Sequence, residues 1–326
     1  MSDFPSVKLH VVTGKGGTGK TTVAASLALA LAAGGRQVLL TEVEGRQGIA
    51  QLFDTPPLPY EERKVAVARG GGEVYALAID PEAALLEYLE MFYNLKRAGS
   101  ALKRLGAIDF ATTIAPGMRD VLLTGKVMEA ATRERRGGGR LYDAVVLDAP
   151  PTGRIARFLN VNSEVAGLAK MGPVRQQADS VMTLLRSRKT AVHLVTVLEE
   201  MPVQETIDGV AELDRVGLPV GGVIVNMVRD PLLPFDRIAD AAACRLDRAE
   251  LSRGLKSAGV DASDPLVAAL VGEAADHAGR VQLEERERTE LAELERPTYE
   301  LPMLADTVDL ACLYDLGEQL AAQGLV

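Results

Sequence analysis

Short apolar runs alternate with longer amphipathic segments along this chain of 326 residues. A β-branched run at residues 7–13 ends in a cluster of glycines, and the Ala- and Leu-rich segment 20–33 that follows reads as a helix closed by two glycines. Further short apolar runs recur between helical patterns at residues 37–43, 74–79, 142–147, 191–198 and 220–225. This alternation predicts an α/β fold with a doubly wound, mostly parallel sheet.

The interval between the third and fourth apolar runs has no comparable strand signal. Residues 84–95 and 119–131 show helical patterns instead, and another helical stretch covers residues 163–188. We therefore predict a single domain over the whole chain with an inserted helical subdomain, at about residues 81–136 plus 160–189.

The segment from residue 228 to residue 296 is charged and helical in pattern. Pairs such as Glu284 and Arg288 stand four residues apart, a spacing that usually marks the solvated face of a helix. We interpret these charges as structural.

Residues 14–22 read GKGGTGKTT and match the phosphate-loop pattern G-x-x-x-x-G-K-[ST] between a predicted strand and a predicted helix. Glycines let the backbone direct N–H groups at phosphate oxygens, and the helix N-terminus adds a favourable dipole. Lys20 is expected to bridge the β- and γ-phosphates of ATP, Thr21 to ligate Mg²⁺ and Thr22 to hold the α-phosphate. The candidate nucleotide-binding residues of this loop are Gly14, Lys15, Gly16, Gly17, Thr18, Gly19, Lys20, Thr21 and Thr22.

Asp148 ends the fourth apolar run, where a carboxylate could hold Mg²⁺ or its water opposite Thr21. Gly153 follows shortly after and could offer a backbone N–H to the γ-phosphate. A turn cap at the end of the strand is the alternative role for Asp148.

The segment 148–159, DAPPTGRIARFL, resembles the second switch D-x-A-P-T-G-x-T-x-R-x-L of the arsenical-pump and tail-anchored-protein targeting ATPases. Pro150 stands where that family usually has alanine, and Ile155 stands where threonine is usual.

The phosphate loop carries a lysine directly after its first glycine, which marks the deviant Walker class. The resemblance implies a dimer in which Lys15 stabilises charge on the phosphates of the opposing subunit, as an arginine finger does. The alternative is a lysine merely exposed on the loop.

Two later segments extend this resemblance. Asn226 follows the sixth apolar run, where the family has an asparagine that reads the adenine ring; a capping or turn asparagine is the alternative. Residues 301–304, LPML, are similar to the family's loop that closes over the base, which makes Pro302 a candidate contact.

The first switch departs from the family pattern. The family usually shows D-P-A-H after the second strand, with the aspartate positioning the attacking water, whereas this chain has EGRQ at residues 44–47. Glu44 keeps the carboxylate but extends it by one methylene, and a misplacement of about 1 Å can reduce a rate roughly 10²-fold. Glu44 is the candidate catalytic residue beside Lys15, Lys20 and Asp148. The alternatives are Glu42 or a purely structural role.

Composition narrows the choice of partners. A formal net charge of -9 disfavours a general nucleic-acid binder. The sequence lacks both a long uncharged apolar run and a basic, apolar leader, so we predict a cytoplasmic protein without an integral membrane segment. Two cysteines without C-x-x-C spacing and three histidines argue against zinc, and the zinc clasp and metalloid cysteines of the family relatives do not appear.

Three hypotheses follow for function. The first is an ATP-driven switch that binds and releases a hydrophobic protein or membrane-associated client. The second is a regulatory subunit that holds nucleotide, hydrolyses little and pairs with a catalytic paralogue; homodimer and heterodimer both stay open. The third is a partition-type ATPase, which needs a basic or membrane-binding surface, whereas residues 314–326 contain no lysine or arginine. Methionines of the helical region could line a client groove or simply pack in the core: Met91, Met118, Met128, Met171 and Met182.

Overall fold

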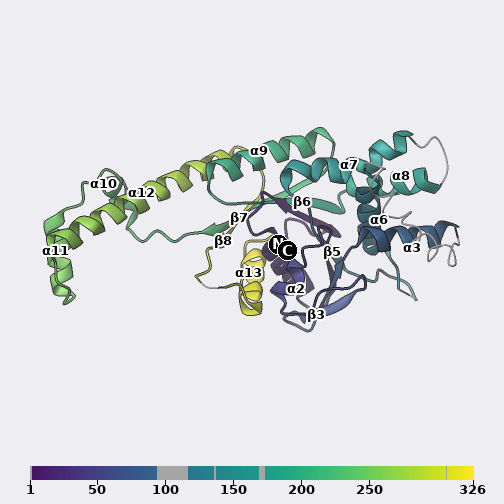
Figure 1. Cartoon of the computed structure of the whole chain (residues 1–326), viewed down its shortest axis with the longest axis horizontal. Helices are drawn as coiled ribbons and strands as arrows, with labels where there is room; N and C mark the ends of the chain where they lie inside the picture. Colours follow the sequence, from purple (N-terminus) through teal and green to yellow (C-terminus); the bar gives the residue numbers. More distant parts are fainter. Residues whose placement is uncertain (1, 94–116, 136, 169–172, 306) are drawn as a thin grey trace.

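A computed structural model describes residues 2–93, 117–135, 137–168, 173–305 and 307–326 (Figure 1). Its centre is an eight-stranded sheet in the order β3-β4-β2-β5-β1-β6-β7-β8. All neighbouring strands run parallel except β3 and β4. The predicted α/β class with a mostly parallel sheet is confirmed. The strands are β1 Leu9–Gly14, β2 Gln37–Glu42, β3 Arg63–Val67, β4 Glu73–Ala78, β5 Ala144–Asp148, β6 Thr190–Thr196, β7 Val220–Val228 and β8 Thr298–Pro302.

The six predicted strands are present, and both edge strands, β3 and β8, were missed. The edge strand β3 is mostly exposed and begins with Arg63 and Lys64, so it lacks the buried run that marks a central strand. Strand β8 buries only Tyr299 and Leu301. The segment 301–304, which the sequence suggested to be a loop, therefore begins as the end of a strand.

Two hydrophobic clusters cover the two faces of the sheet. Val38 and Leu40 belong to one cluster and Leu39 to the other, because successive strand residues point to opposite faces. The first face is covered by α1 (Lys20–Ala32), α2 (Gly48–Leu52) and α13 (Leu310–Ala322), and α1 packs against α13.

The second face carries α9 (Glu200–Arg215) and four helices gathered at one end of the molecule (Figure 1). These four pack on one another and are α3 (Pro81–Tyr93), α6 (Met118–Thr132), α7 (Thr152–Leu168) and α8 (Pro173–Leu185). The prediction of a single helical stretch at residues 163–188 is wrong, because α7 begins earlier, at Thr152, and is followed by a separate helix, α8.

The division into a helical subdomain stays a prediction. Leu122, Leu123 and Val127 of α6 share a core cluster with the strands, so this helix packs on the sheet as well as on its helical neighbours. Parts of the predicted insertion, residues 94–116, 136 and 169–172, lie outside the described residues.

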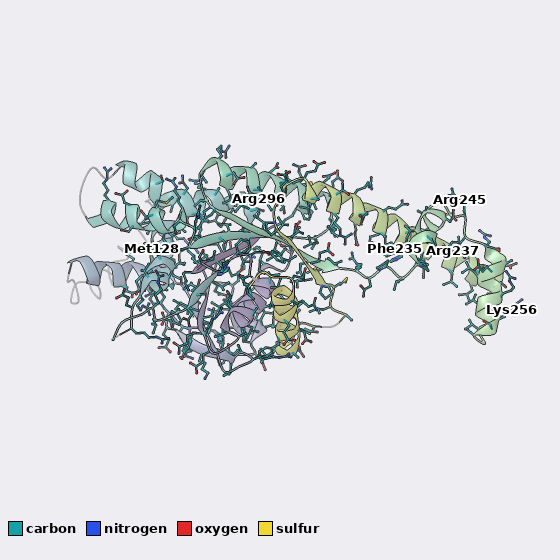
Figure 2. The ribbon with its side chains drawn as sticks, turned by 180° about the vertical axis from the view of Figure 1, so that it is seen from behind. Met128, Phe235, Arg237, Arg245, Lys256 and Arg296 are labelled. Atoms are coloured by element: carbon teal, nitrogen blue, oxygen red, sulfur yellow. The ribbon has the colours of Figure 1, made fainter. Side chains whose placement is uncertain are left out.

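An arm extends from the opposite end of the molecule (Figures 1 and 2). It consists of α10 (Phe235–Ala242), α11 (Arg248–Ser257) and α12 (Asp264–Ala292). Its long helix α12 has 29 residues, and α10 packs on it through Ile238, Ala241 and Ala278. Leu232, shortly before α10, and Phe235, its first residue, are 83% and 79% exposed. The described helices include none that is long and apolar enough to cross a membrane.

Two histidines are buried between β1 and β6. The Nδ1 atom of His10 lies 3.0 Å from Nε2 of His193, and the N–H of Gly222 donates to Nδ1 of His193 at 3.1 Å. The Nε2 atom of His193 therefore carries its proton and donates to His10. Burial lowers the pKa of His193 to about 4, and burial together with His193 and Lys8 lowers the pKa of His10 well below its ordinary value.

This pair predicts acid sensitivity. Both rings are neutral when folded but gain protons near pH 6.5 when unfolded, so their contribution is present above about pH 6.5 and is lost at lower pH. For His193 the loss continues as the pH falls toward 4, and His10 acts in the same direction. Each ring should change the free energy of unfolding by up to about 1.4 kcal/mol per pH unit in that window. Urea unfolding at several pH values measures the slope.

The variant His10→Asn/His193→Gln should flatten that slope, whereas the control His277→Gln on the arm should retain it. Equal slopes in the wild type and the double variant would show that the pair makes no such contribution.

Candidate nucleotide-binding site

The phosphate loop lies at the edge of the sheet where the parallel strands end. Residues 14–22 connect β1 to α1, and β2 and β5 end beside them at Glu42 and Asp148. Gly19 precedes α1 with φ 83°, and a Cβ there would lie 2.3 Å from Nδ2 of Asn226. Both its backbone conformation and this close approach require glycine.

Thr21 and Asp148 meet across this edge. The Thr21 hydroxyl donates to Oδ2 of Asp148 at 2.7 Å, while Oδ1 is buried and has no hydrogen-bond partner among the described residues. Burial raises the pKa of Asp148 to about 6, although Thr21 and Lys20 act in the opposite direction. A hydroxyl beside a carboxylate oxygen without a partner is a donor set that fits Mg²⁺, which prefers oxygen ligands.

The ammonium group of Lys20 shares this small pocket. Burial lowers the pKa of Lys20, although Asp148 and Glu44 favour its charged form. The lining residues are Lys20, Thr21, Glu42, Glu44, Arg46, Gly48 and Asp148. The structure thus brings together the predicted phosphate-binding lysine, both predicted metal ligands and the first-switch carboxylate.

The two glutamates of the first switch have different surroundings. Glu42 is buried, and its two carboxylate oxygens accept from the N–H groups of Gln47 at 2.8 Å and Ile49 at 3.3 Å. Its carboxylate therefore holds the turn that leads into α2. The Glu44 side chain is 22% exposed, and its Oε2 lies 3.6 Å from Nε of Arg46. Unlike that of Glu42, the carboxylate of Glu44 accepts from no backbone N–H group among the described residues. The role of Glu44 as a water-positioning residue stays a prediction.

Lys15 points to a second pocket of ≈ 260 Å³ on the other side of the loop. Its Nζ atom lies 2.9 Å from Oε1 of Glu205 on α9. Gly16, Gly17 and Thr18 also line this pocket, as do Arg229 and Glu284 at the base of the arm. The sequence did not indicate Glu205 as the partner of Lys15, because 190 residues separate the two and no pattern connects them.

Asn226 fastens the phosphate loop to β7. Its buried Nδ2 donates to the carbonyl oxygen of Thr18 at 2.9 Å. One amide hydrogen is thereby engaged in positioning the loop, a contact that the sequence did not reveal. The predicted adenine contact of Asn226 remains a prediction.

The remaining candidates lie around the same edge. Thr22 is in the first turn of α1, and Gly153 is in the first turn of α7. Pro302 ends β8, where the following residue, Met303, donates its N–H to the carbonyl of Val228 at 2.7 Å. Their nucleotide contacts stay predictions.

Comparison with known proteins agrees with this geometry. Residues 7–187, more than half of the chain, match the anion-transporting ATPases. The chain belongs to that family. The matched segment contains the phosphate loop and both switches, so the predicted resemblance and the ATPase activity that it implies are confirmed.

Curated relatives extend the similarity beyond the matched segment. The chain is 56% identical to the ATPase BagA of Mycobacterium tuberculosis over 324 residues, which are 99% of this chain and 95% of that protein. It is 30% identical to the ATPase GET3 of Kluyveromyces lactis over 251 residues, 67% of this chain and 71% of that protein. The protein is an ATPase of the same family as GET3.

The contacts of Glu42 predict a loss of stability on its removal. Glu42→Ala leaves two N–H groups of the switch turn without an acceptor, which should lower the free energy of unfolding by about 1–3 kcal/mol. Glu44→Ala, the matched control two residues away, should lose less because Glu44 pairs only with side chains. Urea unfolding compares the two. Equal losses would contradict a structural role for Glu42.

Proposed function

We propose that this ATPase is a nucleotide-driven dimeric switch whose state controls the binding of a client through the helices α3, α6, α7 and α8. The observation that carries the proposal is the small pocket in which Lys20, Thr21, Asp148 and Glu44 gather. The groups that we assign to phosphate binding, metal binding and water positioning all line this one cavity.

Each residue then has a separate task in phosphoryl transfer. Lys20 contacts the β- and γ-phosphates, and Glu44 orients the attacking water. Thr21 and Asp148 would hold Mg²⁺, which would supply positive charge to the phosphate oxygens. Catalysis of this kind depends mainly on positioning and electrostatics, so the important feature is that the first turn of α1, the end of β5 and the segment after β2 meet at one place.

A second subunit would complete the site. Lys15 lies on the far side of the phosphate loop, where it forms an ion pair with Glu205. On leaving Glu205, its ammonium group could contact the phosphates bound to a facing molecule. Met201 and Met227 line the same pocket and are 61% and 39% exposed. Apolar side chains exposed together suit a protein interface. We propose that the dimer forms over this face, with a second copy or with a paralogous ATPase subunit.

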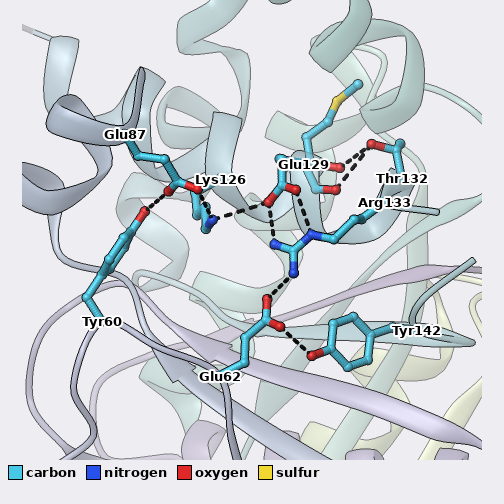
Figure 3. A network of polar contacts seen from close by, with 9 residues as sticks. Tyr60, Glu62, Glu87, Lys126, Glu129, Thr132, Arg133 and Tyr142 are labelled. Atoms are coloured by element: carbon cyan, nitrogen blue, oxygen red, sulfur yellow. Dashed lines mark hydrogen bonds and ion pairs between the residues drawn. The ribbon is translucent and has the colours of Figure 1, made fainter. Parts of the chain in front are cut away.

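A polar network supports coupling between the site and the helices (Figure 3). Tyr60 and Glu62 belong to the segment between α2 and β3, which follows the first switch along the chain. The Tyr60 hydroxyl donates to Glu87 on α3 at 2.6 Å, and Arg133 after α6 donates to Glu62 at 2.7 Å. The network is completed by Lys126, Glu129 and Tyr142. A displacement of this segment would therefore be transmitted to α3 and α6.

The described methionines of the helical region favour core packing over a client groove. Met182 is buried, and Met118 and Met128 are partly buried against the core of the second face. Met171 and the side chain of Met91 lie outside the described residues. We propose that a hydrophobic client contacts other residues of the helical region.

The surroundings of Glu44 favour a second candidate, a regulatory subunit with little hydrolysis. Arg46 lies 3.6 Å from one oxygen of Glu44 and Arg154 lies 4.0 Å from the other. Ion pairs to two guanidinium groups would engage the carboxylate oxygens that the attacking water needs as acceptors. Such a subunit would bind ATP and rely on a catalytic paralogue for turnover.

Hydrolysis of Mg²⁺–ATP under single-turnover conditions tests the proposal. Lys20→Ala should abolish turnover and weaken nucleotide binding, whereas Lys15→Ala should lower turnover about 10³-fold or more and leave binding intact, as expected of a charge that acts in trans. Nucleotide occupancy is measured in parallel.

Mixing the two inactive variants separates action in trans from action in cis. In a mixed homodimer, the Lys15→Ala subunit keeps its own Lys20 and receives Lys15 from its partner, so one site works and activity partly recovers. Absence of recovery would contradict a homodimer with Lys15 acting in trans. Tight binding without turnover in the wild type would favour the regulatory subunit.

A further inference from the structure

Arg154 lies between the first switch and the helical region. It follows Gly153 in the first turn of α7, at a position that the second-switch pattern leaves variable. Its Nη1 atom is 4.0 Å from Oε1 of Glu44, and its Nη2 atom is 3.9 Å from Oδ1 of Asp120. One planar guanidinium group thus faces a carboxylate of the active site and a carboxylate of α6.

The surrounding cavity connects these groups. A pocket of ≈ 210 Å³ is lined by Arg154 and both carboxylates, and also by Leu123 of α6 and Phe158 of α7. Glu44 and Arg46 line this pocket and also the pocket that contains Lys20 and Asp148. Glu44 therefore lies between the phosphate site and a cavity that α6 and α7 help to line.

Asp120 has surroundings that favour a cationic partner. It lies in the first turn of α6 with its side chain 21% exposed. Burial raises the pKa of Asp120, and the charges of Arg154, Arg119 and Arg157 oppose that shift. Among these, Arg154 is the one that also reaches Glu44, and the rigid fork of an arginine suits two acceptors better than a lysine does.

We propose that Arg154 is a positioning residue that orients the Glu44 carboxylate toward the phosphate pocket and ties it to Asp120 on α6. A glutamate has one more rotatable bond than the aspartate usual at this position, so its carboxylate needs an external contact to hold one orientation. Arg154 supplies that contact, and Asp120 holds Arg154. The position of α6 then sets the position of the catalytic carboxylate. This proposal rests on the proposed role of Glu44 in hydrolysis.

The effect should appear in the rate and not in stability. The Arg154 side chain is 60% exposed, and exposed ion pairs contribute little to folding. A misplaced reacting group, in contrast, lowers a rate by up to roughly 10²-fold for about 1 Å of displacement.

The test measures Mg²⁺–ATP hydrolysis by the full chain, in whatever assembly it forms in solution, and compares the wild type with four variants. These are Arg154→Ala, Arg154→Lys, Asp120→Asn and the double variant Arg154→Ala/Asp120→Asn. Arg154→Ala should lower kcat about 10-fold or more without changing KM, and Arg154→Lys should restore part of the loss. Asp120→Asn should lower kcat less, and it should add nothing in the double variant. The control Arg215→Ala removes an exposed arginine of α9, paired with Glu212, and should match the wild type.

Amide hydrogen exchange in the nucleotide-free protein gives a readout that needs no turnover. Arg154→Ala should speed exchange at residues 43–48 and in the first turn of α6, whereas Arg215→Ala should not. Unchanged exchange at both places, an unchanged kcat, or additive losses in the double variant would each overturn the proposal.

Glu44→Gln separates this proposal from the proposed function. If Glu44→Gln loses turnover and Arg154→Ala keeps it, only the positioning role fails. If Glu44→Gln keeps turnover, the catalytic assignment of Glu44 fails and the positioning proposal falls with it.

Discussion

The hydrogen bond from Thr21 to Asp148 joins the first turn of α1 to the end of β5, and the site depends on the geometry that allows it. Strands β1 and β5 are parallel neighbours, with Val12 in register with Asp148, so the loop after one strand starts beside the end of the other. Parallel strands need helical crossovers, and the helices cover both faces of the sheet. The loops that follow the strands are consequently collected at one edge, where ligands bind in open α/β sheets.

Opposite charges meet at this edge of the sheet, but not every charged atom has a hydrogen-bond partner in the described part of the chain. Burial disfavours the charged forms of both Lys20 and Asp148, and one oxygen of Asp148 lacks a partner among the described residues. Buried polar groups without partners reduce stability, and such groups occur where a ligand will pair with them. Under the proposed function, a nucleotide with its cation would supply opposite charges to both groups, and the electrostatic cost of burying them would contribute to binding.

The sequence predicted the features that depend on local pattern. The phosphate loop is contiguous, and the central strands are continuous apolar runs, so both could be located from residue order alone. The edge strand β8 was missed because Tyr299 and Leu301 are its only buried residues, too few for a periodic signal. Glu42 and Glu44 are chemically identical, and only their partners distinguish them: backbone N–H groups for Glu42 and guanidinium groups for Glu44.

The sequence could not reveal the contacts between segments that are far apart along the chain. Through these contacts the site is connected to the arm at one end of the molecule and to the helical region at the other. At one end, Arg229 and Glu284 at the base of the arm form a 3.0 Å ion pair and line the pocket that holds Lys15. At the other end, Asp120 of α6 lines a pocket with Glu44. The family match ends at residue 187, whereas the similarity to BagA spans 99% of the chain and therefore includes the arm. The phosphate loop therefore lies in the segment that matches the family model, and the arm beside the Lys15 pocket lies in a segment that is similar to BagA.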